Sequence, residues 1–121
     1  MAFIRFTDTS ARVGDPQVSI WSRGQIGFNQ GAMQEFNIRD FQYVVLYFEP
    51  ESQRIGFELT NDKDEKGVIK FVFRDNSGAS ISAIPFLRAN RINYKEGTKK
   101  YDVEMDTEGK LLIVDLKNPK Q

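Results

Sequence analysis

The sequence predicts a mainly β domain, a compact barrel or sandwich that also carries two short helices. Three observations support this prediction. The chain has 121 residues, 40% of them hydrophobic, so it can bury one core without disulfides, and we expect a single domain over residues 1–121. Its ten Phe and four Tyr favour the pleated, half-buried surface of strands. Short apolar segments also recur between turn-forming residues along the whole chain.

The first half of the chain alternates strands and turns. Strands are expected at residues 2–7, 18–22, 25–28, 43–48 and 54–59. Arg23–Gly24 and Pro50–Gln53 supply turns between them. Asn29 is a favourable N-cap, and a short helix is therefore predicted over residues 30–36.

The second half follows the same order after an exposed loop at residues 61–67. Strands are expected at residues 68–73, 79–81, 100–105 and 110–116. Ser82 is the expected N-cap of a second short helix, with Pro85 in its first turn and Asn90–Arg91 at its end. Phe86 and Leu87 are expected to face inward from that helix.

The two halves form a candidate internal repeat over approximately residues 18–59 and 78–116. Each half reads strand, short helix, hairpin, and aligning Gly24 with Gly78 also matches Met33 with Leu87. One such unit is too small to bury its own apolar face, so two copies around a pseudo-twofold axis would share a core. The alternative is that hairpins and matched apolar residues arise in any β-rich chain.

One family has a similar order of residues. Gly24–Asn29, Phe36–Ile38, Val44–Leu46 and Ile55–Phe57 resemble the AbrB-type swapped-hairpin pattern, and residues 78–116 resemble it more weakly. Members of that family usually interlock two such units in a dimer, and they bind DNA or act as antitoxin-like regulators. The resemblance implies that this chain forms the same barrel from two tandem units.

The family's basic residues are largely replaced in the first unit. Gln25 follows the glycine, and Gln34 and Glu35 lie near the positions of the family's helical arginines. The second unit keeps Arg88 and Arg91 in and just after its helix. DNA affinity comes mostly from Lys and Arg side chains that neutralise phosphates, so the resemblance supports the scaffold better than the DNA contact.

The composition excludes several kinds of chemistry. The chain has no cysteine and no histidine, which removes disulfides, thiolate nucleophiles and Ser-His-Asp triads. Asp62, Asp64 and Glu65 lack the spacing of an EF-hand, and the paired carboxylates elsewhere fall in turns. We therefore predict no catalytic residue, no metal and no cofactor, and a protein that is not an enzyme.

Two groups of residues are candidate contacts with a partner. Arg23, Arg88 and Arg91 would contact nucleic acid if symmetry gathers them on one face, with Trp21 and Tyr94 available for stacking. The alternative is a set of solvated arginines scattered over a neutral surface, since 17 Lys and Arg balance 17 Asp and Glu. Tyr43, Tyr47 and Phe48 belong to a strand so apolar that it is buried on both faces or meets a partner subunit.

These observations favour a protein-interaction or oligomerisation module on an AbrB-like scaffold, with a homodimer or another protein as its partner. The alternatives are an AbrB-like DNA-binding regulator and a small-ligand protein or enzyme that uses carboxylate, tyrosine or lysine. The segment Met1–Phe6 lacks the apolar region of a signal peptide. No apolar run approaches the ~20 residues that span a bilayer, so we expect no membrane association and a cytoplasmic location.

Overall fold

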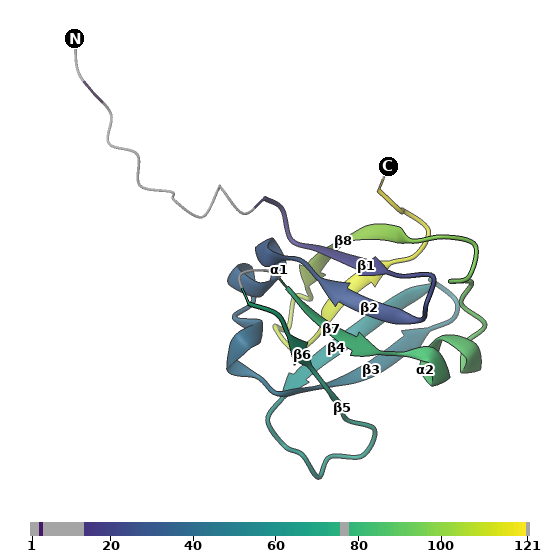
Figure 1. The fold of residues 1–121 in the computed structure, drawn as a ribbon, viewed down its shortest axis with the longest axis horizontal. Coiled ribbons are helices and arrows are strands. Elements are labelled where there is room, and N and C mark those ends of the chain that lie inside the picture. Colours follow the sequence, from purple (N-terminus) through teal and green to yellow (C-terminus); the bar gives the residue numbers. More distant parts are fainter. Residues whose placement is uncertain (1–2, 4–13, 76–77, 121) are drawn as a thin grey trace.

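The structure is a nine-stranded antiparallel sheet that nearly closes into a barrel (Figure 1). It is a computed structural model that describes residues 3, 14–75 and 78–120. The strand order is β5-β3-β4-β9-β8-β1-β2-β7-β6. The prediction of a mainly β fold with two short helices is confirmed. The strand expected at residues 2–7 lies, apart from Phe3, outside the described residues.

The first half of the chain supplies four strands, one α-helix and one short 3₁₀ helix that the sequence did not predict. Its elements are β1 (Gln17–Ile20), β2 (Gln25–Phe28), α1 (Gln30–Glu35), the 3₁₀ helix η2 (Ile38–Asp40), β3 (Tyr43–Glu49) and β4 (Arg54–Thr60). The second half supplies β5 (Ile69–Lys70), β6 (Val72–Phe73), β7 (Ala79–Ser82), α2 (Ile84–Ala89), β8 (Lys99–Met105) and β9 (Leu112–Asp115).

The two helices begin in different ways. The Asn29 side chain accepts a hydrogen bond from the Ala32 backbone N–H at 2.8 Å, which confirms it as the N-cap of α1. The prediction that Ser82 caps α2 is wrong, because Ser82 is the last residue of β7 and pairs with Gln25. The N-cap position of α2 is Ala83, which makes no side-chain capping bond. The ladder with β2 therefore holds Ser82 in extended backbone, where a helix cap was expected.

The segment Val68–Phe73, expected to be one strand, is divided between the two edges of the sheet. β5 pairs with β3, whereas β6 pairs with β7 at the opposite edge. Phe71 lies between them, is only 4% exposed, and donates its N–H to the Gln42 carbonyl at 3.0 Å. One short segment therefore connects the first and last strands of the sheet and nearly closes the barrel.

The core lies inside the barrel and is dominated by aromatic and β-branched side chains. Phe28 packs edge-on against Phe57 at 5.2 Å between ring centroids, and against Phe71 at 5.7 Å. Phe57 and Ile55 are fully buried on β4. These residues alternate with outward ones, as the period of two along a strand requires.

Two ladders of the sheet join a strand of the first half of the chain to a strand of the second. β2 pairs with β7, and β4 pairs with β9. The glycine alignment is nevertheless one residue out in β2. It matches Ile26 with Ser80, whereas the ladder pairs Ile26 with Ile81 and Gly27 with Ser80. Paired residues share a face and neighbours alternate, so Ile26 and Ser80 lie on opposite faces.

Candidate functional site

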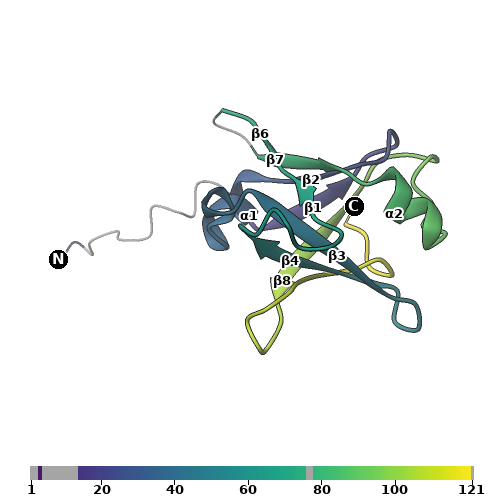
Figure 2. The same ribbon diagram turned by 90° about the horizontal axis from the view of Figure 1, so that it is seen from below.

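The turn between β1 and β2 lies at the same end of the barrel as α2 (Figure 2). The Gly24 carbonyl in this turn accepts a hydrogen bond from the Ala83 N–H at 3.0 Å. Ile20, the last residue of β1, pairs with Lys99, the first residue of β8. The exposed Arg23 in the turn is therefore next to the elements that carry the other basic residues.

Arg88 and Arg91 are exposed at the C-terminal end of α2. The Arg91 N–H donates to the Arg88 carbonyl at 3.1 Å, and the Ile92 N–H donates to the Leu87 carbonyl at 2.9 Å. This is the ending in which the residue after the helix is left-handed and is commonly glycine. Here the position holds Arg91 with φ 55°, a conformation that costs a side chain about 1 kcal/mol.

Three lysines that the sequence analysis did not select belong to the same end of the barrel. Lys95 lies in the segment between α2 and β8, and Lys99 and Lys100 begin β8. All three are exposed, and Glu96 is the only acidic residue between Arg88 and Lys100. We call the resulting surface the basic end and define it by Arg23, Arg88, Arg91, Lys95, Lys99 and Lys100.

The basic end is not neutralised by ion pairs. In the part of the chain that the structure describes, the two ion pairs are Arg54–Glu49 and Lys120–Asp102, and neither uses a residue of the basic end. The sequence does indicate this basic surface, because cations are frequent and acidic residues rare between Arg88 and Lys100. The neutral total charge concealed it, because most of the compensating carboxylates lie outside the run from Arg88 to Lys100, the nearest being Asp102 and Glu104 further along β8.

Trp21 and Tyr94, the two predicted stacking residues, differ in access. Tyr94 is 7% exposed and belongs to the core, so its ring cannot stack on a ligand. Trp21 is half-buried and lines a surface hollow of about 420 Å³ together with Arg23 and Arg74. Of the two aromatics, Trp21 is the one that a ligand at this end can reach.

Tyr43, Tyr47 and Phe48 do not form one surface. Tyr43 and Tyr47 are on the outer face of β3, and Tyr47 is 45% exposed. The Phe48 ring faces the other way and packs edge-on against Phe86 at 6.4 Å between centroids. The Tyr47 hydroxyl donates to Glu58 at 2.8 Å, and this hydrogen bond to a carboxylate raises the pKa of Tyr47.

An apolar groove of about 330 Å³ lies beside Tyr47 on the outer face of β3, β4 and β9. Its floor is Gly56, which pairs directly with Tyr47. A side chain at this position would contact Leu111, whose Cδ1 is 3.2 Å from where a Cβ would lie. Ile113 continues the apolar strip along β9. Tyr47 is the residue of the predicted apolar strand 43–48 that projects into this groove, on the outer face of the sheet.

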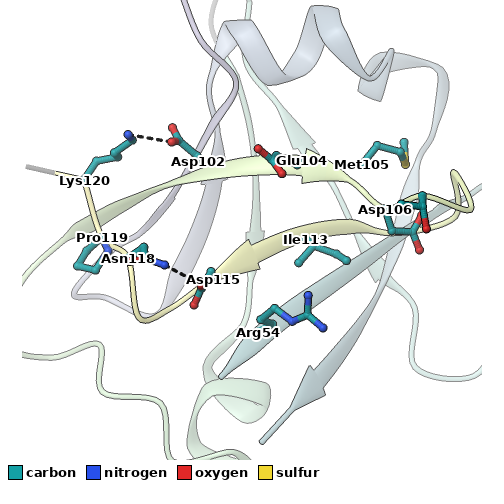
Figure 3. A pocket seen from close by; sticks show the side chains of 11 residues that line it. Arg54, Asp102, Glu104, Met105, Asp106, Ile113, Asp115, Asn118, Pro119 and Lys120 are labelled. Atoms are coloured by element: carbon teal, nitrogen blue, oxygen red, sulfur yellow. Dashed lines mark hydrogen bonds and ion pairs between the residues drawn. The ribbon is translucent and has the colours of Figure 1, made fainter. Parts of the chain in front are cut away.

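A hollow of about 860 Å³ lies between the β8–β9 hairpin and the C-terminal segment (Figure 3). Four of its eleven lining residues carry carboxylates, and most of these carboxylates have structural partners. Asp102 pairs with Lys120 at 2.9 Å, and the Asn118 amide donates to Asp115 at 2.7 Å (Figure 3). The Lys120–Asp102 ion pair attaches the end of the described chain to β8, and the Asn118–Asp115 hydrogen bond holds the turn after β9.

Two carboxylates of this hollow have lowered pKa values because they accept hydrogen bonds from backbone N–H groups and so stabilise turns. Backbone N–H groups of Leu111 and Lys110 donate to Asp106 and hold its pKa below the usual range. The Lys117 N–H does the same for Asp115. Both pKa shifts favour the ionised form, whereas a general acid needs a raised pKa. Across residues 3, 14–75 and 78–120, no group of three or more acidic side chains is arranged to hold a metal ion.

No protein-family model, curated protein or solved structure matches this chain. The fold and the surfaces described above therefore carry the functional argument. None of the helices in the described residues has the length and apolar character to span a bilayer.

Proposed function

We propose that this protein is a non-enzymatic interaction module and that its partner is nucleic acid, bound at the basic end. The observation that carries the proposal is the separation of charge. A chain with no net charge presents six exposed cations at one end of its barrel, with Glu96 as the acidic residue among them. Nucleic-acid-binding domains are characterised by cations clustered on one face rather than by total charge alone.

The shape of the basic end supports this proposal. Its residues come from the β1–β2 turn, from α2 and the segment that follows it, and from the start of β8, so they extend over several elements instead of forming a single point charge. Such an arrangement suits successive phosphates of a polyanion. The carboxylates with lowered pKa values are exposed (Glu49) or half-buried (Asp106 and Asp115) and are hydrogen-bonded in turns, which supports a non-enzymatic role.

A salt series tests the proposal. We expect the protein to bind labelled oligonucleotide in fluorescence anisotropy at ~20 mM salt. Each phosphate neutralised on duplex DNA contributes about 0.9 to the slope of log affinity against log salt. Six cations therefore set a limit of about −5, and we expect a slope between about −3 and −5. Absence of binding at ~20 mM salt would contradict the proposal.

We also propose that the barrel is a tandem AbrB-like arrangement produced by duplication. The support is the correspondence of ladders, since β2 pairs with β7, β4 with β9, and the β1–β2 ladder has its counterpart in β6–β7. Under this proposal the second unit retains the cations of Arg88 and Arg91, and the first unit contributes Arg23 from its turn.

Self-association through the apolar groove is a second candidate function. Tyr47 projects beside the hollow over Gly56, so each copy presents a projecting ring next to a cavity. A twofold axis between two copies would place the ring of each in the hollow of the other, as isologous interfaces require. The two functions are compatible, because a dimer would present two basic ends.

Tyr47→Lys is expected to disrupt such a dimer. A buried ammonium in an apolar interface has a large desolvation cost, so the dissociation constant should rise at least about tenfold. Sedimentation equilibrium from ~1 to ~300 µM measures the change. Val72→Lys, at a residue that is 59% exposed on β6, is the matched control and should leave the dimer intact. A wild-type protein that stays monomeric over this range would remove the self-association candidate.

A further inference from the structure

The hollow beside Trp21 combines an aromatic wall with two cations. It is lined by residues of β1, of β2 and of the turn between them, by Asn29 after β2, and by Arg74, Gly78 and Ala79. Arg23 and Arg74 are both exposed at its edge, and neither belongs to an ion pair within the described residues. Arg39 lies close by, since its guanidinium donates to the Arg74 carbonyl at 2.7 Å.

The position of Trp21 depends on a glycine beneath it. A Cβ on Gly27 would lie 2.6 Å from two carbons of the six-membered ring of Trp21, closer than such contacts allow. The ring therefore occupies the space that any side chain at position 27 would need. Gly27 supports one side of the ring, and the ring in turn forms a wall of the hollow.

Arg23 belongs to both the hollow and the basic end. A strand whose phosphates follow the basic end would therefore reach the hollow at Arg23 and could continue to Arg74. Asn29 also lines the hollow, but its side chain is already engaged with backbone groups of Gln17, Asp15 and Ala32. The side-chain groups left to bind a ligand are an aromatic ring, two guanidinium groups and the Ser19 hydroxyl.

Resting on the proposed function, we propose that this hollow binds one unpaired nucleobase against Trp21 and that the protein prefers single-stranded over duplex nucleic acid. In a duplex the faces of the bases are covered by their neighbours, and only the base edges are accessible. An aromatic ring flanked by guanidinium groups recognises the face of a base and the phosphates beside it. The hollow has the volume for one base and its sugar.

The experiment compares an oligothymidylate of about 12 nucleotides with an abasic oligomer of the same length and charge. Trp21 is the only tryptophan of the chain, so fluorescence excited at the long-wavelength edge, where the four tyrosines do not absorb, reports on this hollow alone. We expect the oligothymidylate to quench the fluorescence and to bind about tenfold more tightly than the abasic oligomer, as one stacked base predicts. Trp21→Ala should abolish the difference in affinity, Trp21→Phe should retain part of it, and Arg74→Ala should weaken both oligomers equally.

The outcomes separate this inference from the proposed function. If both oligomers bind equally and the fluorescence does not change, the base site is wrong while nucleic-acid binding stands. If neither oligomer binds at low salt, both proposals are wrong. The quenching measurement uses the wild-type protein and does not depend on the folding of a variant. Thermal melting of Trp21→Ala and Trp21→Phe shows whether their affinities refer to folded protein.

Discussion

Replacing Arg23, Arg88 and Arg91 together by alanine is expected to lower nucleic-acid affinity by two to three orders of magnitude at ~50 mM salt. Each phosphate contact contributes about one unit to the salt slope and therefore about one order of magnitude in affinity at this salt. The slope itself should decrease by about 3 if all three residues contact phosphates. Anisotropy titrations at several salt concentrations measure both quantities.

The matched control removes the same charge from another surface. Lys63, Lys66 and Lys110 are exposed outside the basic end, and their triple alanine variant should change the affinity less than about threefold. Equal losses in the two triple variants would show that total charge, and not the basic end, determines binding.

Arg91→Gly separates binding from folding. Glycine suits the left-handed conformation at this position, so the variant should gain a few tenths to about 1 kcal/mol of stability. It should nevertheless bind more weakly, because it loses a cation of the basic end. A variant that is more stable but binds less well rules out unfolding as the cause of the weaker binding.

Phe71→Ala is expected to destabilise the protein by about 3–5 kcal/mol, a large fraction of the stability of an ordinary domain. The ring is buried against Phe28 and Phe73, and Phe71 is the single residue between β5 and β6. Its loss leaves a cavity at the place where the two edges of the sheet meet. Chemical denaturation measures the total effect, and hydrogen exchange should show that β5 and β6 lose protection before β8 and β9.

The neighbouring residue provides the control for this prediction. Val72 is 59% exposed, so Val72→Ala should change the stability by no more than about 0.5 kcal/mol. If Phe71→Ala instead lowers hydrogen-exchange protection equally in all strands, Phe71 has no local role where the two edges of the sheet meet. The barrel would then unfold as one unit.

The local elements could largely be predicted from the sequence. The strand at residues 25–28 and the Asn29 cap of α1 depend on neighbours close in the chain, and the structure confirms both. The wrong cap at Ser82 has a tertiary cause, because pairing with Gln25 holds Ser82 in β7. The 3₁₀ helix at Ile38–Asp40 follows Asn37 in a left-handed conformation, and the sequence analysis did not anticipate it.

The candidate site could be predicted only in part. Arg23, Arg88 and Arg91 were selected as residues that symmetry would bring together, and the structure places the turn of Arg23 beside α2. The sequence alone does not place Lys95, Lys99 and Lys100 beside these arginines, because their position depends on where the chain returns after α2. The prediction for Tyr43, Tyr47 and Phe48 treated a run of neighbours as one surface. Alternation along β3 instead directs Phe48 away from Tyr47.

The sequence by itself determined the class of the fold, most of its strands, one helix cap and the absence of cysteine and histidine chemistry. These features follow from composition and from patterns within a few residues. Only the tertiary structure decided that the segment Val68–Phe73 serves both edges of the sheet, that Trp21 lies over Gly27, and that the cations collect at one end. Each of these depends on contacts between residues far apart in the chain. Such contacts are fixed by the register and closure of the whole sheet, which no local pattern specifies.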